Sequence, residues 1–120
     1  MANEGYIKLY RKMKKWGWYK DQNTKDVFLH LLLEACYETC YFKGVPLEPG
    51  QVITTVKEIS DGTGISVRSV RTSLERLKST NELTIETSSK FSLITLLNYT
   101  DYQGSDKGSD KQVTNERQTN

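Results

Sequence analysis

The sequence predicts an α+β fold that is mainly helical, and the observations that predict it lie between residues 49 and 98. Apolar residues at helical spacing mark a short helix and then a longer one, separated by Gly62-Thr63-Gly64. A strand is expected before this pair at residues 51–55, and two β-rich runs follow it. Strand, short helix, turn, long helix and hairpin in this order describe a winged helix-turn-helix, here with an N-terminal aromatic and basic arm.

The first helix of the pair is short. Val56 and Ile59 are its only large apolar side chains, and their spacing of three can bury one face of about two turns. We expect the stop at Gly62 and Gly64, because a chain that reverses within a few residues often needs positive φ, where a Cβ clashes. Ser66 is then a suitable N-cap for the second helix, because its hydroxyl can accept a bond from a free backbone N–H.

The second helix is predicted to have one buried stripe and one outward side. The stripe consists of Val67, Val70, Leu74 and Leu77, which recur at spacings of three and four. The outward side carries the residue types that contact phosphates and base edges when a helix enters a DNA major groove. The residues predicted to bind DNA from this helix are Ser66, Arg68, Ser69, Arg71, Thr72 and Arg76. The alternative is an ordinary solvated helix, so the context of the helix decides between the two.

That context is a hairpin. Residues 82–87 and 90–98 are β-rich runs joined by Ser88 and Ser89, and a recognition helix followed directly by a hairpin is a wing. Ser88, Ser89 and Lys90 at the tip are predicted to touch phosphate or the minor groove. The strand at residues 51–55 is expected to pair with this wing.

Residues 1–22 are predicted to form an arm that packs on the domain. Residues 1–20 contain six basic groups and one acid, a net charge of +5, whereas the whole chain carries only +2. Aromatic rings beside cations can stack on bases or clamp a nucleic-acid backbone, and five rings interleave with these lysines: Tyr6, Tyr10, Trp16, Trp18 and Tyr19. We expect most of the rings to be buried, with the lysines left to phosphate or to an acidic partner.

Residues 23–103 are predicted to form the winged domain, which opens with a buried helix from Asn23 to Tyr41, capped by Asn23 or Thr24. Leu33 and Tyr37 widen its apolar face, so either the arm covers two sides or the helix offers a surface to another subunit. Residues 41–47 are expected to be a loop or an irregular edge. The apolar face itself consists of Val27, Phe28, Leu31, Leu32, Ala35 and Cys36.

Cys36 and Cys40 would lie one turn apart on this helix, a spacing that suits two thiols better than a disulfide. With His30 they offer at most three ligands, so we expect no metal and no cofactor. No stretch approaches eighteen apolar residues and no secretory signal follows Met1. We therefore expect a cytoplasmic protein with reduced thiols and no membrane partner.

An enzyme is not expected. The only histidine lies in the apolar helix, and no glycine-rich phosphate loop is present in the sequence. Carboxylates such as Glu58 and Asp61 have no histidine, cysteine or metal partner at a suitable spacing.

The chain changes character at Gly104. Residues 104–120 contain no aromatic residue, a doubled Gly-Ser-Asp-Lys, and three acids that balance three bases. Such a segment cannot bury enough apolar surface to order itself. We expect a disordered polar tail or linker that joins the domain to a further part, or alternatively a solubilising end.

Six segments of the chain resemble one family. They are YIKLYR at residues 6–11, WGWYKD at 16–21, FLHLLL at 28–33, PGQVITT at 49–55, GISVRSVRTSLERL at 64–77 and LITLLNY at 93–99. Together they look like the N-terminal winged-helix domain of phage and prophage replication proteins, the replisome-organiser group related to DnaD primosomal proteins. The resemblance implies contact with origin or single-stranded DNA and oligomerisation through the winged domain. It also implies a C-terminal domain that recruits helicase, which we do not expect in this chain, so that role is not carried over.

We therefore expect the DNA-binding module of a phage-type replication initiation protein, with DNA and replication proteins as partners. A homo-oligomer, most simply a dimer, is expected because Trp16, Trp18, Tyr19, Leu33 and Tyr37 compete for cover from one small core. Two other functions fit the same fold. They are a small winged-helix transcriptional regulator and an oligomerisation or protein-interaction adaptor.

Overall fold

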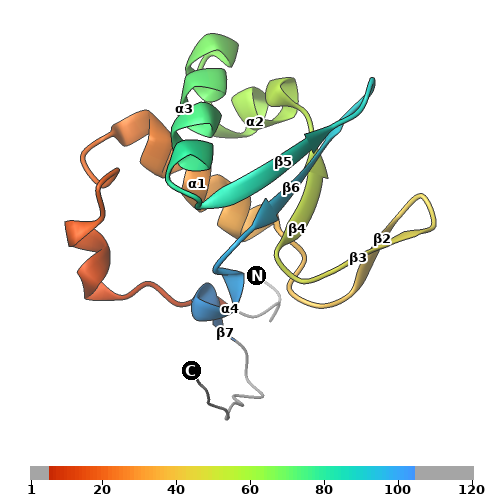
Figure 1. The fold of residues 1–120 in the computed structure, drawn as a ribbon, viewed down its shortest axis with the longest axis horizontal. Helices are drawn as coiled ribbons and strands as arrows, with labels where there is room; N and C mark the ends of the chain where they lie inside the picture. Colours follow the sequence, from red (N-terminus) through yellow and green to blue (C-terminus); the bar gives the residue numbers. More distant parts are fainter. Residues whose placement is uncertain (1–5, 105–120) are drawn as a thin grey trace.

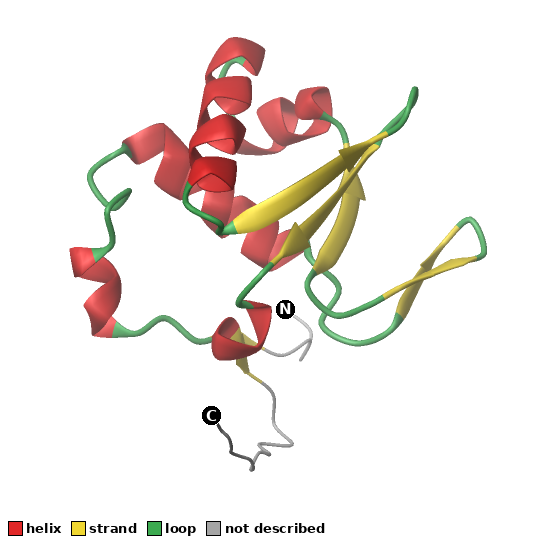
Figure 2. Ribbon diagram, in the orientation of Figure 1, coloured by secondary structure: helices red, strands yellow, loops and turns green. Residues whose placement is uncertain are grey.

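The structure, a computed structural model, describes residues 6–104. Its longer helices gather beside a small sheet, while the N-terminal arm and a second hairpin extend from opposite sides (Figures 1 and 2). The elements are β1 (Tyr6–Ile7), the 3-10 helix η1 (Arg11–Lys15), α1 (Gln22–Glu34), β2 (Cys40–Phe42), β3 (Val45–Leu47), β4 (Gln51–Thr54), α2 (Val56–Thr63), α3 (Val67–Ser79), β5 (Leu83–Thr87), β6 (Ser92–Leu96), α4 (Tyr99–Tyr102) and β7 (Gln103–Gly104). The fold is thus of the mixed α+β kind that the sequence predicts.

Strands β4, β6 and β5 form an antiparallel sheet in that order. Ile94 of β6 lies opposite Val52 of β4 on one side and Ile85 of β5 on the other. The expected pairing of residues 51–55 with the later hairpin is confirmed. Two further antiparallel pairs, β2–β3 and β1–β7, lie outside this sheet.

Helix α1 is the central element of the core and contacts both α2 and α3. The predicted cap at Asn23 or Thr24 is wrong, because the helix starts at Gln22 and its N-cap is Asp21, whose side chain accepts a hydrogen bond from the backbone N–H of Thr24. The buried apolar core contains side chains of α1 itself and of α2, α3, α4 and the main sheet. They are Val27, Phe28, Leu31, Leu32, Ala35, Val52, Ile59, Val70, Leu74, Leu77, Leu83, Ile94, Leu96 and Tyr99.

The predicted end of this helix at Tyr41 is wrong, because α1 ends at Glu34 and Ala35 is already extended, with ψ of 148°. The backbone of Cys36 then joins the start of β4. Its N–H donates to the carbonyl of Gln51 at 3.0 Å, and its carbonyl accepts from the N–H of Gly50 at 2.7 Å. Hydrogen bonds to the sheet therefore replace those that a longer helix would make.

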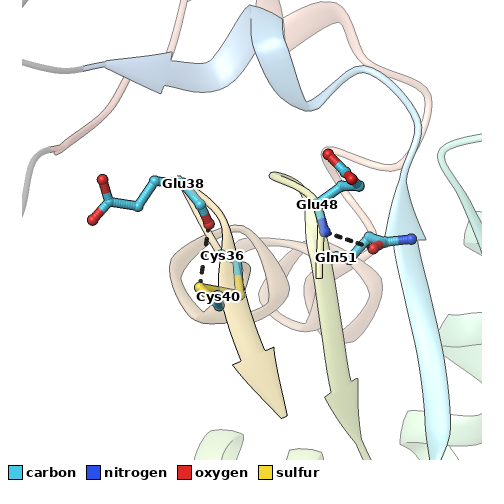
Figure 3. The surroundings of a disulfide bond; sticks show 5 residues. All are labelled: Cys36, Glu38, Cys40, Glu48 and Gln51. Carbon is cyan, nitrogen blue, oxygen red and sulfur yellow. Dashed lines mark hydrogen bonds between the residues drawn. A yellow bond between two sulfur atoms is a disulfide. The ribbon is translucent and has the colours of Figure 1, made fainter. Parts of the chain in front are cut away.

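The expectation of two free thiols is also wrong, because Cys36 and Cys40 form a disulfide. The helix ends before either residue, so their Cα atoms are brought to 6.1 Å, within the range of a disulfide. Figure 3 shows the surroundings of the bond, where Sγ of Cys40 lies 3.3 Å from the carbonyl oxygen of Glu38.

Residues 41–47 form most of a hairpin rather than the expected loop. Strands β2 and β3 pair from Cys40 with Leu47 to Phe42 with Val45. The two residues between them, Lys43 and Gly44, have φ of 51° and 82°. Positive φ at both positions is what a tight two-residue hairpin turn requires.

The arm packs on the domain through its tryptophans. The ring of Trp16 lies 4.9 Å from that of Phe28, and its Nε1–H donates to Glu82 at 2.9 Å. Trp18 donates in the same way to Thr80 at 2.9 Å. Trp16, Trp18 and Tyr19 are half-buried, whereas Tyr6 and Tyr10 are 55% and 48% exposed. The expected burial of most rings is therefore only partly met, and it fails for the last two. The predicted tail from residue 105 onward lies outside the described residues.

Replacement of Gly50 is expected to be costly, because a positive φ and a close neighbour coincide there. It has φ of +89°, and an added Cβ would lie 2.8 Å from Cβ of the buried Tyr99. Gly50→Ala should therefore lower the free energy of unfolding by about 3 kcal/mol, from backbone strain and overpacking together. Gly44→Ala is the matched control, because φ there is +82° but no atom lies within 4 Å. Urea denaturation measures both, and equal losses would contradict a steric role of Tyr99.

The hydroxyl of Tyr99 is buried and finds no hydrogen-bond partner within the described residues. Burial, and then the charge of Tyr37, raise the pKa of Tyr99 above its ordinary value of 10.0. Just above pH 10.0 this tyrosine ionises in the unfolded chain but not in the folded one. The free energy of unfolding is therefore at its full value below pH 10.0 and decreases as the pH rises through the folded pKa. Tyr99→Phe should raise the free energy of unfolding by about 1 kcal/mol at neutral pH and flatten the alkaline loss. Denaturation curves at neutral pH and at several pH values above 10.0 check this. An unchanged decrease of the unfolding free energy with alkaline pH would contradict it.

Candidate nucleic-acid interface

The turn between α2 and α3 is held by side chains on both sides of Gly64. This glycine caps α2 with φ of 78°, whereas Gly62 and Thr63, which were expected to belong to the turn, are still inside the helix, so α2 ends later than predicted. The hydroxyl of Ser60 donates to the carbonyl of Ile65 at 2.6 Å, and that of Thr63 accepts from the N–H of Ile65 at 3.2 Å. These bonds fix the direction in which α3 leaves the turn.

Helix α3 begins at the predicted N-cap, where the hydroxyl of Ser66 accepts from the N–H of Ser69 at 3.2 Å. Three of the four predicted stripe residues are buried, but Val67 is 38% exposed. The stripe includes Ser73 instead, which is 1% exposed and whose hydroxyl lies 3.4 Å from that of Thr24 on α1. Two small side chains at this crossing let the helices approach closely, so the buried stripe is centred nearer the middle of α3.

The outward side of α3 carries cations without carboxylate partners. Arg68 and Arg71 are exposed and form no ion pair within residues 6–104. Thr72 is also exposed, and its hydroxyl donates to the carbonyl of Arg68 at 3.2 Å. Glu75, the acid on the same helix, is paired with Lys78 at 3.7 Å. The first half of α3 therefore presents two uncompensated guanidinium groups and a hydroxyl to solvent.

Arg76 differs from the other predicted DNA contacts. Its guanidinium forms an ion pair with the carboxylate of Asp21, and its centre lies 6.0 Å from the ring of Trp18. The side chain thus links α3 to the arm instead of facing outward. No local pattern could reveal this partner, because Asp21 and Arg76 are 55 residues apart in the sequence.

The tip of the β5–β6 hairpin is a tight turn of residues 88–91. The N–H of Ser88 donates to the carbonyl of Phe91 at 2.8 Å, and its hydroxyl donates to the same oxygen at 3.0 Å. The ring of Phe91 lies 5.4 Å from that of Phe42, so the β2–β3 hairpin supports the tip. Ser88 is therefore used within the turn, while Ser89 and Lys90 are exposed.

Two of these surfaces face the same way. In Figure 1 the hairpin tip and the end of α3 farthest from β5 both project toward the top of the view. The start of α3 and the hairpin tip therefore lie toward the same side of the molecule. An array of cations and hydroxyls on a protruding helix and loop can bind phosphates and reach base edges.

Within the described part of the chain, no cluster of three histidine, cysteine or acidic side chains could hold a metal ion. No helix among residues 6–104 is long and apolar enough to cross a membrane. Comparisons with protein-family models, curated proteins and solved structures find no match for this chain.

Asp21 combines two roles that substitutions can separate. Asp21→Ala removes both the cap of α1 and the partner of Arg76, and should lower the free energy of unfolding by about 1–2 kcal/mol. Asp21→Asn keeps a good cap and loses only the ion pair, and Arg76→Ala loses the ion pair together with the contact to the Trp18 ring. Each should cost less than about 1 kcal/mol. Urea denaturation measures all three. A loss for Asn as large as for Ala would show that the ion pair, and not the cap, dominates.

Proposed function

We propose that this chain is a winged-helix DNA-binding module. The order α1, β4, α2, α3, β5, β6 and the sheet order β4-β6-β5 support this assignment, because they join a helix pair directly to a hairpin. In this reading α3 is the recognition helix and the β5–β6 hairpin is the wing.

The observation that carries the proposal is the uncompensated cations at the start of α3. Arg68 and Arg71 are exposed and form no ion pair in the described chain, whereas Arg76 and Lys78 farther along the helix are both paired. Recognition helices contact base edges with their N-terminal residues. Arg68 and Thr72 are accordingly proposed to reach bases, and Arg71 and Lys90 to hold phosphates. Ser66, Ser69 and Ser89 remain candidate phosphate contacts.

The Cys36–Cys40 disulfide opposes the expected cytoplasmic location, because disulfides are rare in that compartment. We further propose that the module belongs to a phage-type DNA replication initiation protein. This part rests on the resemblance carried by the aromatic arm, the helix pair and the closing Asn98-Tyr99. A transcriptional regulator on the same fold is the second candidate. A palindromic target beside its own promoter would favour the regulator, whereas repeated sites or single-strand preference would favour replication.

An adaptor function is favoured by a different observation, the apolar side chains left in solvent. Leu33 is 73% exposed and Tyr41 is 71% exposed. Such side chains can contact protein, including a second copy of the chain, where they join into a contiguous apolar patch. We propose self-association as a dimer on this ground, and sedimentation equilibrium of the intact chain measures it directly.

Duplex binding should be electrostatic and should depend on Arg68. Titration of a labelled duplex enriched from a random pool is expected to give a log-log salt slope of about −0.9 per phosphate contact. Arg68→Ala should cost about 1–3 kcal/mol on the enriched site and less on an unselected duplex. Lys90→Ala should weaken both duplexes alike.

Arg76→Ala is the matched control, since it removes the same charge from the same helix at a position paired with Asp21. It should leave duplex affinity nearly unchanged. Binding that does not vary between low and moderate salt would overturn the proposal and favour the adaptor. Equal losses on both duplexes for Arg68→Ala would show that α3 does not read bases.

A further inference from the structure

A cleft of about 840 Å³ lies between the arm and α4. Its volume falls within the range of about 300–1,000 Å³ that is typical of ligand sites. Its walls combine aromatic rings, cations and two polar side chains, Asn98 and Asp101, that can contact a base. The lining residues are Tyr10, Lys12, Met13, Lys15, Trp16, Asn98, Asp101 and Tyr102.

The charge of the arm favours an anionic ligand. Residues 6–20 contain six basic residues and no acid. Lys12 and Lys15 on the cleft wall are exposed and form no ion pair within the described chain, and Nζ of Lys12 lies 5.8 Å from the centre of the Tyr10 ring. Two uncompensated ammonium groups, one of them beside an aromatic ring, suit a phosphate that is attached to a planar group.

The aromatic wall is held in place from behind. Trp16 is fixed by its ring contact with Phe28 and by its bond to Glu82, and Phe28 also contacts Tyr102 edge-on, with centroids 5.6 Å apart. Tyr10 is 48% exposed, so one ring is open to a partner. A ring that is already fixed, as that of Trp16 is, loses little conformational entropy when a base stacks on it.

We propose that this cleft binds single-stranded nucleic acid, with a base against Tyr10 or Trp16 and phosphates on Lys12 and Lys15. A duplex keeps its bases stacked inside and cannot offer one to a cleft, whereas a single strand exposes both ring faces and backbone. An acidic peptide would supply the negative charge but no ring face. It would also meet the carboxylate of Asp101, which can instead accept a hydrogen bond from the exocyclic amino group of adenine or cytosine.

The site lies apart from the proposed duplex surface. In Figure 1 the arm and α4 lie at the lower left, away from the free end of α3 and the hairpin tip at the top. The cleft is therefore a second nucleic-acid surface, separate from the proposed duplex contact. A module with both could hold a duplex and an unpaired strand at once.

The test uses the intact chain with labelled oligo(dC), oligo(dT), RNA of the same sequences and a duplex. Lys12→Gln combined with Lys15→Gln should weaken oligo(dC) binding about tenfold or more and reduce its salt slope by about 1.4. Lys8→Gln combined with Lys14→Gln removes the same charge from arm positions that do not line the cleft, so it should have a much smaller effect. Tyr10→Ala should weaken binding at least about fivefold, while Tyr10→Phe keeps the ring and the affinity.

Three further readouts locate the ligand. In a Trp18→Phe background the remaining tryptophan, Trp16, should be quenched by oligo(dC). Asp101→Asn should reduce the preference for oligo(dC) over oligo(dT), and comparison of RNA with DNA identifies which strand the cleft prefers. Arg68→Ala should leave single-strand binding unchanged, so loss of duplex binding and loss of strand binding remain distinguishable.

Several outcomes would overturn the proposal. Equal losses in the two double-lysine variants would mean diffuse attraction to the arm. Displacement of oligo(dC) by oligo-glutamate at equal charge concentration, with the same quenching of Trp16, would identify an acidic peptide as the occupant. Binding of duplex and single strand with equal affinity and equal sensitivity to Tyr10→Ala would exclude base stacking. Circular dichroism of each variant verifies that it is folded.

Discussion

The packing of α1 against α3 is the contact on which the other elements depend. Val27 and Leu31 of α1 and Val70 and Leu77 of α3 are each no more than 1% exposed, and burial of such side chains contributes about 1.5–3 kcal/mol apiece. Because α3 leads directly into β5, this contact also sets where the hairpin starts. The arm then packs on the outside of the same pair, through Asp21 and Arg76.

Local rules predicted the elements whose partners are near in sequence. Ser66 caps α3, and Val70, Leu74 and Leu77 are buried, because capping and helical periodicity act within a few residues. The end of α1 could not be predicted in this way. Its continuing apolar pattern through Cys36 and Tyr37 is overridden by hydrogen bonds to Gly50 and Gln51 in the next sheet, which no local pattern reveals. The disulfide could not be predicted for the same reason, since a spacing of four favours two separate thiols only within a helix, and α1 ends before Cys36.

The candidate site likewise contains residues whose positions local patterns predict and residues whose positions depend on the fold. Exposure of Arg68, Arg71 and Thr72 follows from the period of the helix and was predictable. Capture of Arg76 by the arm was not, because it depends on how α1 and α3 cross. The cleft beside α4 was also hidden. Asn98 and Asp101 come from the end of the described chain and Lys12 and Lys15 from its beginning, and only the fold brings them together.

The β1–β7 pair has a mechanical consequence. Tyr6 lies opposite Gly104 and Ile7 opposite Gln103, so the described chain enters and leaves at the same end of this ladder. A pulling force applied between these two points would open the ladder one rung at a time, because antiparallel strands loaded at a shared end unzip instead of shearing. The next bond in line, from the N–H of Lys8 to the carbonyl of Tyr102, would follow. Tension would therefore separate the arm from α4, and dismantle the cleft between them, while the helices and the main sheet still carried no load.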